Sequence, residues 1–329
     1  MPAEFEQGFS VREPAWHGLA TVLDEYPGRE EAMRLAGHDF RVIEVPVYAE
    51  IEGDTSFSFS PVQPVKGWKA LRKDSDGTVL NVVRDTYTVV QNDVLWDIVD
   101  AIVEQPAVKY ETAGVLKGGA VLWVLARLDE PLQVPGDNTL VYPYIAVSTT
   151  HDGSGGVMGR ATWVRIICWN TFTQAEAQSK RDGREFHFRH TARVHERIEL
   201  AREMLLGVRE DFRSTFALMS ELADVEVSNA QLERFLVDFI PAPPETIISD
   251  RVARNVEEAR DAVRSILNGP TLATTRNTAY GLVQAGVEYL DHVRGYRSNE
   301  THLGRTLLRA EPLKAKLVPL VREVIAAGA

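Results

Sequence analysis

Apolar and polar residues alternate with a period of two over much of the first 170 residues, whereas helical spacing of apolar residues dominates afterwards. The sequence Asp-Ser-Asp-Gly at 74–77 separates two alternating segments and is typical of a β-hairpin turn. Lys-Gly-Gly at 117–119 predicts a second hairpin. The predicted strands are 40–48, 68–72, 79–84 with its extension 87–91, 108–115, 121–127, 140–150, 160–169 and 186–189.

Helical periodicity and end signals predict the remaining elements. Asn92 is a good N-cap residue before an apolar helical pattern, and Pro-Ala-Pro-Pro at 241–244 and Gly-Pro at 269–270 separate later helices. The predicted helices are 29–35, 93–104, 171–179, 192–222, 229–240, 251–267, 276–293 and 305–327. Strands followed by helices predict an α+β fold, with a mainly antiparallel, hairpin-rich sheet. We expect a sheet domain over 1–192 and a helical region over 193–329.

Composition narrows the class of protein. An apolar content of 44% and a charged content of 25% are ordinary for a globular protein. No apolar run approaches the ~20 residues of a membrane span, and the first residues lack the pattern of a secretory signal, so we expect a cytoplasmic protein without a membrane partner. A single cysteine excludes an internal disulfide and a cysteine-based zinc cage.

The net charge of −11 argues against a nucleic-acid partner, but the charge is unevenly distributed. Residues 160–213 carry 11 Lys and Arg against 8 Asp and Glu. This segment is therefore locally basic in an acidic protein. A solvated, charged helix would produce the same excess of basic residues, so both interpretations stay open.

The stretch 151–191 holds the densest group of chemically capable side chains. It starts with the glycine-rich loop His-Asp-Gly-Ser-Gly-Gly, in which Gly153, Gly155 and Gly156 would let backbone N–H groups face a phosphate. The loop lacks the Gly-Lys-Ser/Thr ending of a P-loop and lies between two predicted strands. It is therefore either a flexible hairpin loop or a phosphate contact, and His151 and Asp152 belong to the same candidate site.

Arginine and aromatic residues interleave downstream of this loop. Single-stranded nucleic acid is bound in this way, with bases stacked on aromatic rings and phosphates paired with guanidinium groups. The predicted phosphate contacts are Arg160, Arg165, Arg189 and Arg193, and the predicted stacking residues are Trp163 and Trp169. Structural salt bridges and core packing of the aromatics, including Phe186 and Phe188, are the alternatives.

Further polar residues belong to the candidate site, but none completes a catalytic motif. Cys168 could act as a nucleophile with His190 as base and Asp152 as orienting acid, yet no nucleophile elbow surrounds it, and a lone cysteine ending an apolar strand is typically a buried hydrophobe. His187 and His190 lack a carboxylate at metalloprotease spacing. We therefore predict no catalytic residue, no metal and no cofactor, and keep Asn170 and Thr171 as binding candidates.

Several motifs occur in an order that resembles a known family. They are PAWHGLATVL, LNVVRDTYTVVQN, TAGVLKGGAVLWVLARL, HDGSGG, VRIICWNTFTQA, FRHTARV and NTAYGLVQAGVEYLDHVRGYRSNE. Together they resemble the phage/plasmid-like family also called domain of unknown function 932. The resemblance implies a context of bacteriophages, plasmids and prophages, and so a host-cell cytoplasm, but it implies no activity.

Three functions follow as hypotheses. The leading one is a non-catalytic protein that binds nucleic acid, with single-stranded DNA, annealing or recombination and a homo-oligomeric state as its specific form. The second is a phage protein that binds a host or phage protein, for example to counter host defence, through its acidic N-terminal half. The third is an enzyme acting on a nucleotide or another phosphorylated small molecule, using the glycine-rich loop with Arg165, Asn170 and His190.

Overall fold

The computed structural model consists of two compact units, each built from several chain segments. The first unit comprises Met1–Arg127, Ile145–Arg160 and Glu185–Leu206, and the second comprises Leu128–Tyr144, Ala161–Arg184 and Gly207–Ala329. The sequence-based boundary after residue 192 stays a prediction. The structure describes residues 5–12, 20–51, 62–103, 109–128, 131–153, 155–165, 170–172, 185–198, 208–244, 249–295 and 312–327.

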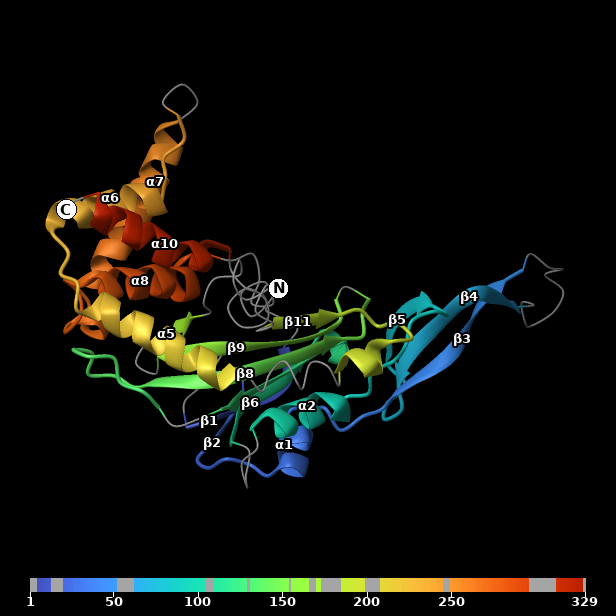
Figure 1. Ribbon diagram of the computed structural model, residues 1–329. Coiled ribbons are helices and arrows are strands. Elements are labelled where there is room, and N and C mark those ends of the chain that lie inside the picture. Colours follow the sequence, from blue (N-terminus) through green and yellow to red (C-terminus); the bar gives the residue numbers. More distant parts are fainter. Residues whose placement is uncertain are drawn as a thin grey trace. The chain divides into compact units, whose positions relative to one another are not determined.

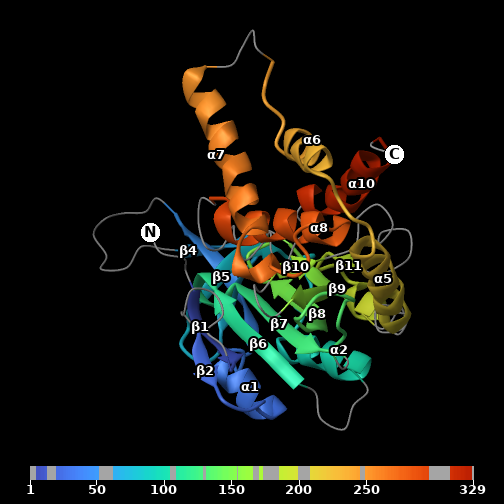
Figure 2. The same ribbon diagram turned by 90° about the vertical axis from the view of Figure 1, so that its left-hand side faces the viewer.

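Eight strands form a mixed sheet. In chain order they are β1 (Phe5–Val11), β2 (Thr21–Leu23), β6 (Lys109–Leu116), β7 (Val121–Arg127), β8 (Val141–Thr150), β9 (Val157–Arg165), β10 (Asn170–Phe172) and β11 (Glu185–Phe188). Their order in the sheet is β10-β9-β8-β7-β6-β1-β2, and β11 also pairs with β9 (Figure 2). The predicted 117–119 hairpin is confirmed, since β6 and β7 pair antiparallel on either side of the short helix η2 (Lys117–Gly119).

A second sheet of three antiparallel strands lies in the first unit. Its order is β3-β4-β5, with bounds β3 (Val42–Glu50), β4 (Val62–Lys73) and β5 (Val79–Arg84). The predicted turn at 74–77 joins β4 to β5, as the alternation on both sides of it requires. The α+β class and the predominance of hairpins are thereby confirmed.

The core of the first unit surrounds β6 and β7, whose side chains are almost all buried. Two helices pack against these strands: α1 (Arg29–Leu35) contacts β6, and α2 (Asp93–Val103) contacts β7 (Figure 1). Leu95, Trp96, Ile98 and Val99 of α2 are fully buried, as their helical spacing predicts. Strands buried on both faces lose the polar alternation, which accounts for the continuous apolar run of β7.

The described helices of the second unit gather around one central helix, α8. Their bounds are α5 (Val208–Ala223), α6 (Asn229–Phe239), α7 (Asp250–Leu267), η3 (Pro270–Leu272), α8 (Ala279–Glu288), the π-helical turn η4 (Tyr289–Val293) and α10 (Pro312–Ala326). Residues from Ala279 to Val287 are all buried, and α5, α7 and α10 pack around them (Figure 2). A helix that is buried on all sides is apolar all round, and within the buried span of this one only Tyr280 and Gln284 carry polar groups.

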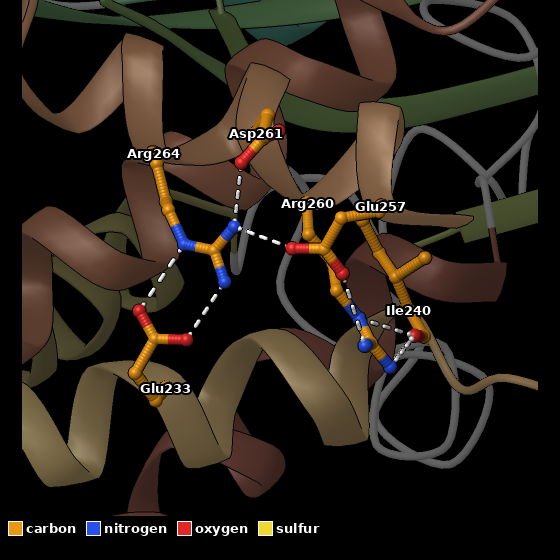
Figure 3. Close-up of polar contacts among 6 residues, drawn as sticks. All are labelled: Glu233, Ile240, Glu257, Arg260, Asp261 and Arg264. Atoms are coloured by element: carbon orange, nitrogen blue, oxygen red, sulfur yellow. Dashed lines mark hydrogen bonds and ion pairs between the residues drawn. The ribbon is translucent and has the colours of Figure 1, made fainter. Parts of the chain in front are cut away.

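A polar network joins α6 to α7. The Arg264 guanidinium makes two hydrogen bonds to the Glu233 carboxylate, of 3.1 and 2.7 Å, and further bonds to Glu257 and Asp261 (Figure 3). Arg260 donates to the carbonyl of Ile240, directly after the last residue of α6. This carbonyl has no partner inside the helix, so the arginine caps it.

Two details of the sequence-based assignment are wrong. Residues 87–91 do not extend β5, because β5 ends at Arg84 and a turn follows. Thr171 and Phe172 belong to β10, not to a helix, because this segment pairs with β9. The mainly antiparallel sheet also contains one parallel pair, β1 with β2. Among the described residues no helix combines the length and the apolar character needed to span a bilayer.

A buried ion pair holds α10 against the π-helical turn. The ammonium of Lys314 contacts the carboxylate of Asp291, and their side chains are only 4% and 2% exposed. Two charges withdrawn from water this completely are stable only while they compensate each other. By contrast, the pair between Arg322 and Glu221 spans 3.8 Å, with side chains 58% and 73% exposed.

Replacing Lys314 by Met removes the cation and leaves the Asp291 carboxylate buried. We expect the free energy of unfolding to fall by about 3–5 kcal/mol. Arg322→Met is the matched control and should cost at most about 1 kcal/mol, because water screens an exposed pair. Urea denaturation followed by circular dichroism measures both values, and equal losses in the two variants would contradict the assignment.

Candidate functional site

His151 lies directly after β8, in the first unit, and is fully buried. Its backbone N–H donates to the carbonyl of Ala120 at 2.6 Å, beside the start of β7. Its ring Nε2 lies 3.0 Å from Oδ1 of Asn92, a residue 59 positions earlier that immediately precedes α2. The glycine-rich loop therefore begins in the interior of the unit.

Asn92 links His151 to a third segment. Its amide nitrogen donates to the carbonyl of His38 at 3.1 Å and to that of Phe40 at 2.8 Å. Because both donor protons are used, Oδ1 is the acceptor and Nε2 of His151 carries the proton. The side chain predicted to cap α2 is thus directed to other segments. Nδ1 of His151 has no hydrogen-bond partner within the described part of the chain.

His38 is fully buried, and both of its ring nitrogens are hydrogen-bonded. Nε1 of Trp96 donates to Nδ1 at 3.2 Å, so Nε2 carries the proton and donates to the carbonyl of Gly114 at 2.9 Å. This is the arrangement of a neutral imidazole. It attaches the segment after α1 to both α2 and β6.

His190 completes the cluster from the segment after β11. Its Nδ1 donates to the carbonyl of Thr88 at 3.1 Å, and Nε2 accepts from Oγ1 of Thr149 at 3.2 Å. The ring stacks on Tyr87, with 4.6 Å between centroids, and Tyr87 in turn donates to the carbonyl of Thr150 at 3.0 Å. The centroid of the His151 ring lies 6.2 Å from that of His190.

All three histidines of this network are neutral at pH 7. Burial lowers the pKa of His38 to about 4, and burial together with the nearby His190 lowers the pKa of His151 to about 3. Burial also lowers the pKa of His190 to about 4, and its bond to Thr88 opposes this shift. Both ring nitrogens of His38 and of His190 are bonded within the protein, and such buried imidazoles suit a supporting role better than proton transfer.

Asp152 is engaged away from His190. Its carboxylate lies 3.2 Å from the ammonium of Lys117, and its carbonyl accepts a short hydrogen bond from Asn81 of β5. The Nδ1 proton of His190 is bonded to Thr88. A triad in which Asp152 orients His190 is therefore absent from the described residues. Nor do these residues contain a group of three or more His, Cys, Asp or Glu placed to bind a metal ion.

The glycines of the loop serve close packing of the backbone. A Cβ atom on Gly156 would lie 1.9 Å from the carbonyl oxygen of Phe188, so only glycine lets the loop approach β11 this closely. Gly153 has a φ of 72°, a conformation that other residues rarely adopt. Gly155 adjoins the side chain of Thr150.

The structure separates the other predicted site residues. His187, Arg189 and Arg193 are exposed, whereas Arg160 is 2% exposed and lies opposite Glu185 in the register of β9 and β11. In the second unit, backbone register places Arg165 opposite Asn170, Val164 opposite Thr171, and Trp163 opposite Phe172. Cys168 and Trp169 lie outside the described residues.

Exposed cations concentrate in residues 187–197, which we call the arginine segment. Arg189, Arg193 and Arg197 are exposed, and none has a side-chain hydrogen bond or ion pair with the described residues. The backbone N–H of Arg197 bonds to the carbonyl of Arg193, so these two residues lie one helical turn apart. Val194 and Ile198 are buried and anchor the other side of this turn.

Three members of the buried network escaped the sequence analysis as site residues: His38, Asn92 and Tyr87. Only Asn92 carried a local signal, and that signal was read as a helix cap. The Asp291–Lys314 pair of the second unit was missed as well, because its members lie on different helices and no periodicity links them. Pairing between distant segments was the missing information in each case.

Comparison with known proteins gives one match. A family model described as "Domain of unknown function (DUF932)" matches residues 79–310, a range that includes β5, α2, the glycine-rich loop and the arginine segment. Neither the curated proteins nor the solved structures contain a match.

The buried histidines make stability depend on pH. Each binds a proton more weakly in the folded chain than in the unfolded chain, whose histidine pKa is about 6.5. Their contribution to stability is complete above pH 6.5 and is lost as the pH falls from 6.5 towards 4. We expect the free energy of unfolding to fall by up to about 1.4 kcal/mol per pH unit for each histidine.

Urea titrations at pH 7.0, 6.0 and 5.0 measure this slope. His190→Gln should flatten it by removing one titrating group. Identical slopes in the wild-type protein and in His190→Gln would show that His190 does not titrate abnormally.

Asn92→Asp tests the centre of the network. A carboxylate cannot donate to the carbonyls of His38 and Phe40, so two buried acceptors lose their donor. We expect a loss of about 2–5 kcal/mol in the free energy of unfolding. Asn229→Asp, at the exposed first residue of α6, is the control and should be neutral or slightly stabilising. Equal effects at both positions would refute the assigned role of Asn92.

Proposed function

Since the chain belongs to the DUF932 family, whose description assigns no activity, we propose from its geometry that the protein binds nucleic acid without catalysing a reaction. The arginine segment is the binding surface, and its guanidinium groups contact backbone phosphates. A guanidinium group offers planar, paired N–H donors that fit a phosphate, and its charge does not depend on pH in the physiological range.

One observation carries this proposal: three exposed guanidinium groups within nine residues have no carboxylate partner among the described residues, in a chain with a net charge of −11. Several other arginines of the protein are neutralised by acidic neighbours, as Arg29 is by Asp97 and Asp100. A cation without such a partner has no nearby carboxylate that competes with a phosphate ligand.

The buried network holds this surface in place. The N–H of Thr88 donates to the carbonyl of His190 at 3.2 Å, and the ring of His190 bonds to Thr88 and Thr149. His190 follows Arg189 directly, so the backbone that carries the first arginine is fixed from two sides. A ligand then meets a surface whose backbone at His190 is already ordered, which lowers the entropic cost of binding.

The ligand and the biological role that we propose follow from the phage and plasmid context that the sequence motifs suggest. We propose single-stranded DNA of a phage or plasmid as the ligand, a role in annealing or recombination, and assembly into homo-oligomers in the host cytoplasm. Neutral, hydrogen-bonded histidines beside the surface favour binding over the enzymatic alternative.

Fluorescence anisotropy with a labelled single-stranded oligonucleotide tests the function. The triple variant Arg189→Gln, Arg193→Gln, Arg197→Gln should lose affinity by about tenfold or more at 50 mM salt. Loss of three phosphate contacts should also reduce the slope of log affinity against log salt by about 2.

The matched control removes the same charge elsewhere. Arg41, Arg251 and Arg254 are exposed and have no side-chain carboxylate partner among the described residues, and their triple Gln variant should retain the wild-type affinity and salt slope. Equal losses of affinity in both triple variants would show that the effect comes from net charge and not from the arginine segment. A wild-type protein that binds no oligonucleotide at 50 mM salt would refute the function and favour the protein-binding alternative.

A further inference from the structure

The two faces of the second sheet differ in exposure at the end of β4 and in β5. Leu71 of β4 and Val83 of β5 are buried on the first face. Trp68 and Ala70 are two residues apart on β4 and therefore share the opposite face. Trp68 is 37% exposed there, whereas Ala70 is buried. Of the tryptophans whose side chains the structure describes, Trp68 is the exposed one, since Trp96 and Trp123 are fully buried.

Strand register places apolar and cationic residues around this tryptophan. Trp68 pairs with Arg84, and Ala70 pairs with Val82 on one side and Val45 on the other. The side chain of Val82 is 43% exposed. We call this surface the Trp68 face; its members are Ile43, Val45, Trp68, Ala70, Arg72, Val79, Val82 and Arg84.

Arg84 and Trp68 form a stacked pair. The guanidinium carbon of Arg84 lies 4.0 Å from the centroid of the Trp68 ring. A guanidinium group held on an aromatic ring keeps its charge and its edge donors, and its plane can itself stack against a base. The pair therefore presents a π surface and a phosphate contact together.

The charged residues differ between the two faces of this sheet. The Trp68 face carries Arg72 and Arg84, and none of its eight register positions is a carboxylate. Glu44 projects from the other face, where it is paired with Lys69 at 2.8 Å. The exposed face thus complements a polyanion.

The edges of this sheet are unsuited to an added protein strand. Pro46 interrupts the donors of β3 because proline has no N–H. On β5, Oδ1 of Asn81 accepts a hydrogen bond from the N–H of Val82 at 2.8 Å. A ligand therefore meets the Trp68 face rather than extending the sheet edge, which argues against strand addition by a protein partner.

Local connectivity brings the Trp68 face close to the arginine segment within the first unit. Arg84 ends β5, and four residues later Thr88 is bonded to His190. An extended chain of four residues spans at most about 14 Å. A single strand whose phosphates contact Arg189 can therefore extend over a few nucleotides towards Trp68.

We propose that the Trp68 face is a base-stacking platform for single-stranded nucleic acid, next to the phosphate contacts of the arginine segment. The inference rests on the proposed function and adds a requirement for unpaired bases. An exposed aromatic ring flanked by arginines binds unpaired bases irrespective of sequence, whereas the bases of a duplex are stacked on each other.

The experiment compares Trp68→Leu with the wild-type protein on three probes of equal length: a single-stranded oligonucleotide, an abasic strand with the same phosphates, and a duplex. Anisotropy should show about tenfold weaker binding of the single strand by the variant. Binding of the abasic strand and of the duplex should be unchanged. The same measurement with a DNA strand and with an RNA strand of equal sequence shows which of the two nucleic acids the protein binds more tightly.

Two further variants separate the outcomes. Trp68→Phe keeps a stacking ring and should retain most of the wild-type affinity for the single strand. If Trp68→Leu instead caused a structural defect, its loss of affinity would be the same for probes with and without bases. The triple arginine variant should weaken binding of the single strand and of the abasic strand alike. If it does so while Trp68→Leu binds all probes normally, the platform is refuted and the proposed function stands. If the wild-type protein binds none of the probes, both fail.

Discussion

The first unit depends on the hydrogen bonds of one amide group, that of Asn92. Its two donors and one acceptor are satisfied by His38, Phe40 and His151, so it joins the segment after α1 and the end of β8 to the start of α2. A buried amide that lacks its partners costs several kcal/mol, so these segments must adopt one arrangement together. The position of the glycine-rich loop follows from that requirement, and Thr149, Thr150 and His190 connect it to the arginine segment.

Burial divides the chemistry of this region into two roles. The histidines, which sequence motifs would nominate for catalysis, are withdrawn from water and neutral, and they position the backbone. The exposed arginines have no carboxylate partner among the described residues, so their charges are not compensated by an ion pair there. In this way an acidic protein can present a cationic surface: the sign of the local charge matters for a phosphate within a Debye length of about 8–10 Å.

The second unit illustrates how burial determines the weight of an ion pair. The network of Arg264 has several partners, but it lies at the surface between α6 and α7, where solvent screens it. The Lys314–Asp291 pair is almost completely buried beside the π-helical turn. It therefore constrains the packing of α10 far more strongly than the Arg264 network constrains α6 and α7. Asp291 lies in the π-helical turn that follows α8, and such turns are frequent at functional sites.

Local pattern alone determined much of the architecture: the 74–77 turn, the span of α2, and the helices α6 and α7. Asn92 was misread because capping and long-range bonding use the same amide, and Thr171 because a short strand is defined only by its partner, β9. Tertiary structure alone decided that Arg160 is buried while Arg189 is exposed, and that Trp68 stacks with Arg84. Periodicity reports which face of an element is apolar, but what covers that face depends on pairing between distant segments.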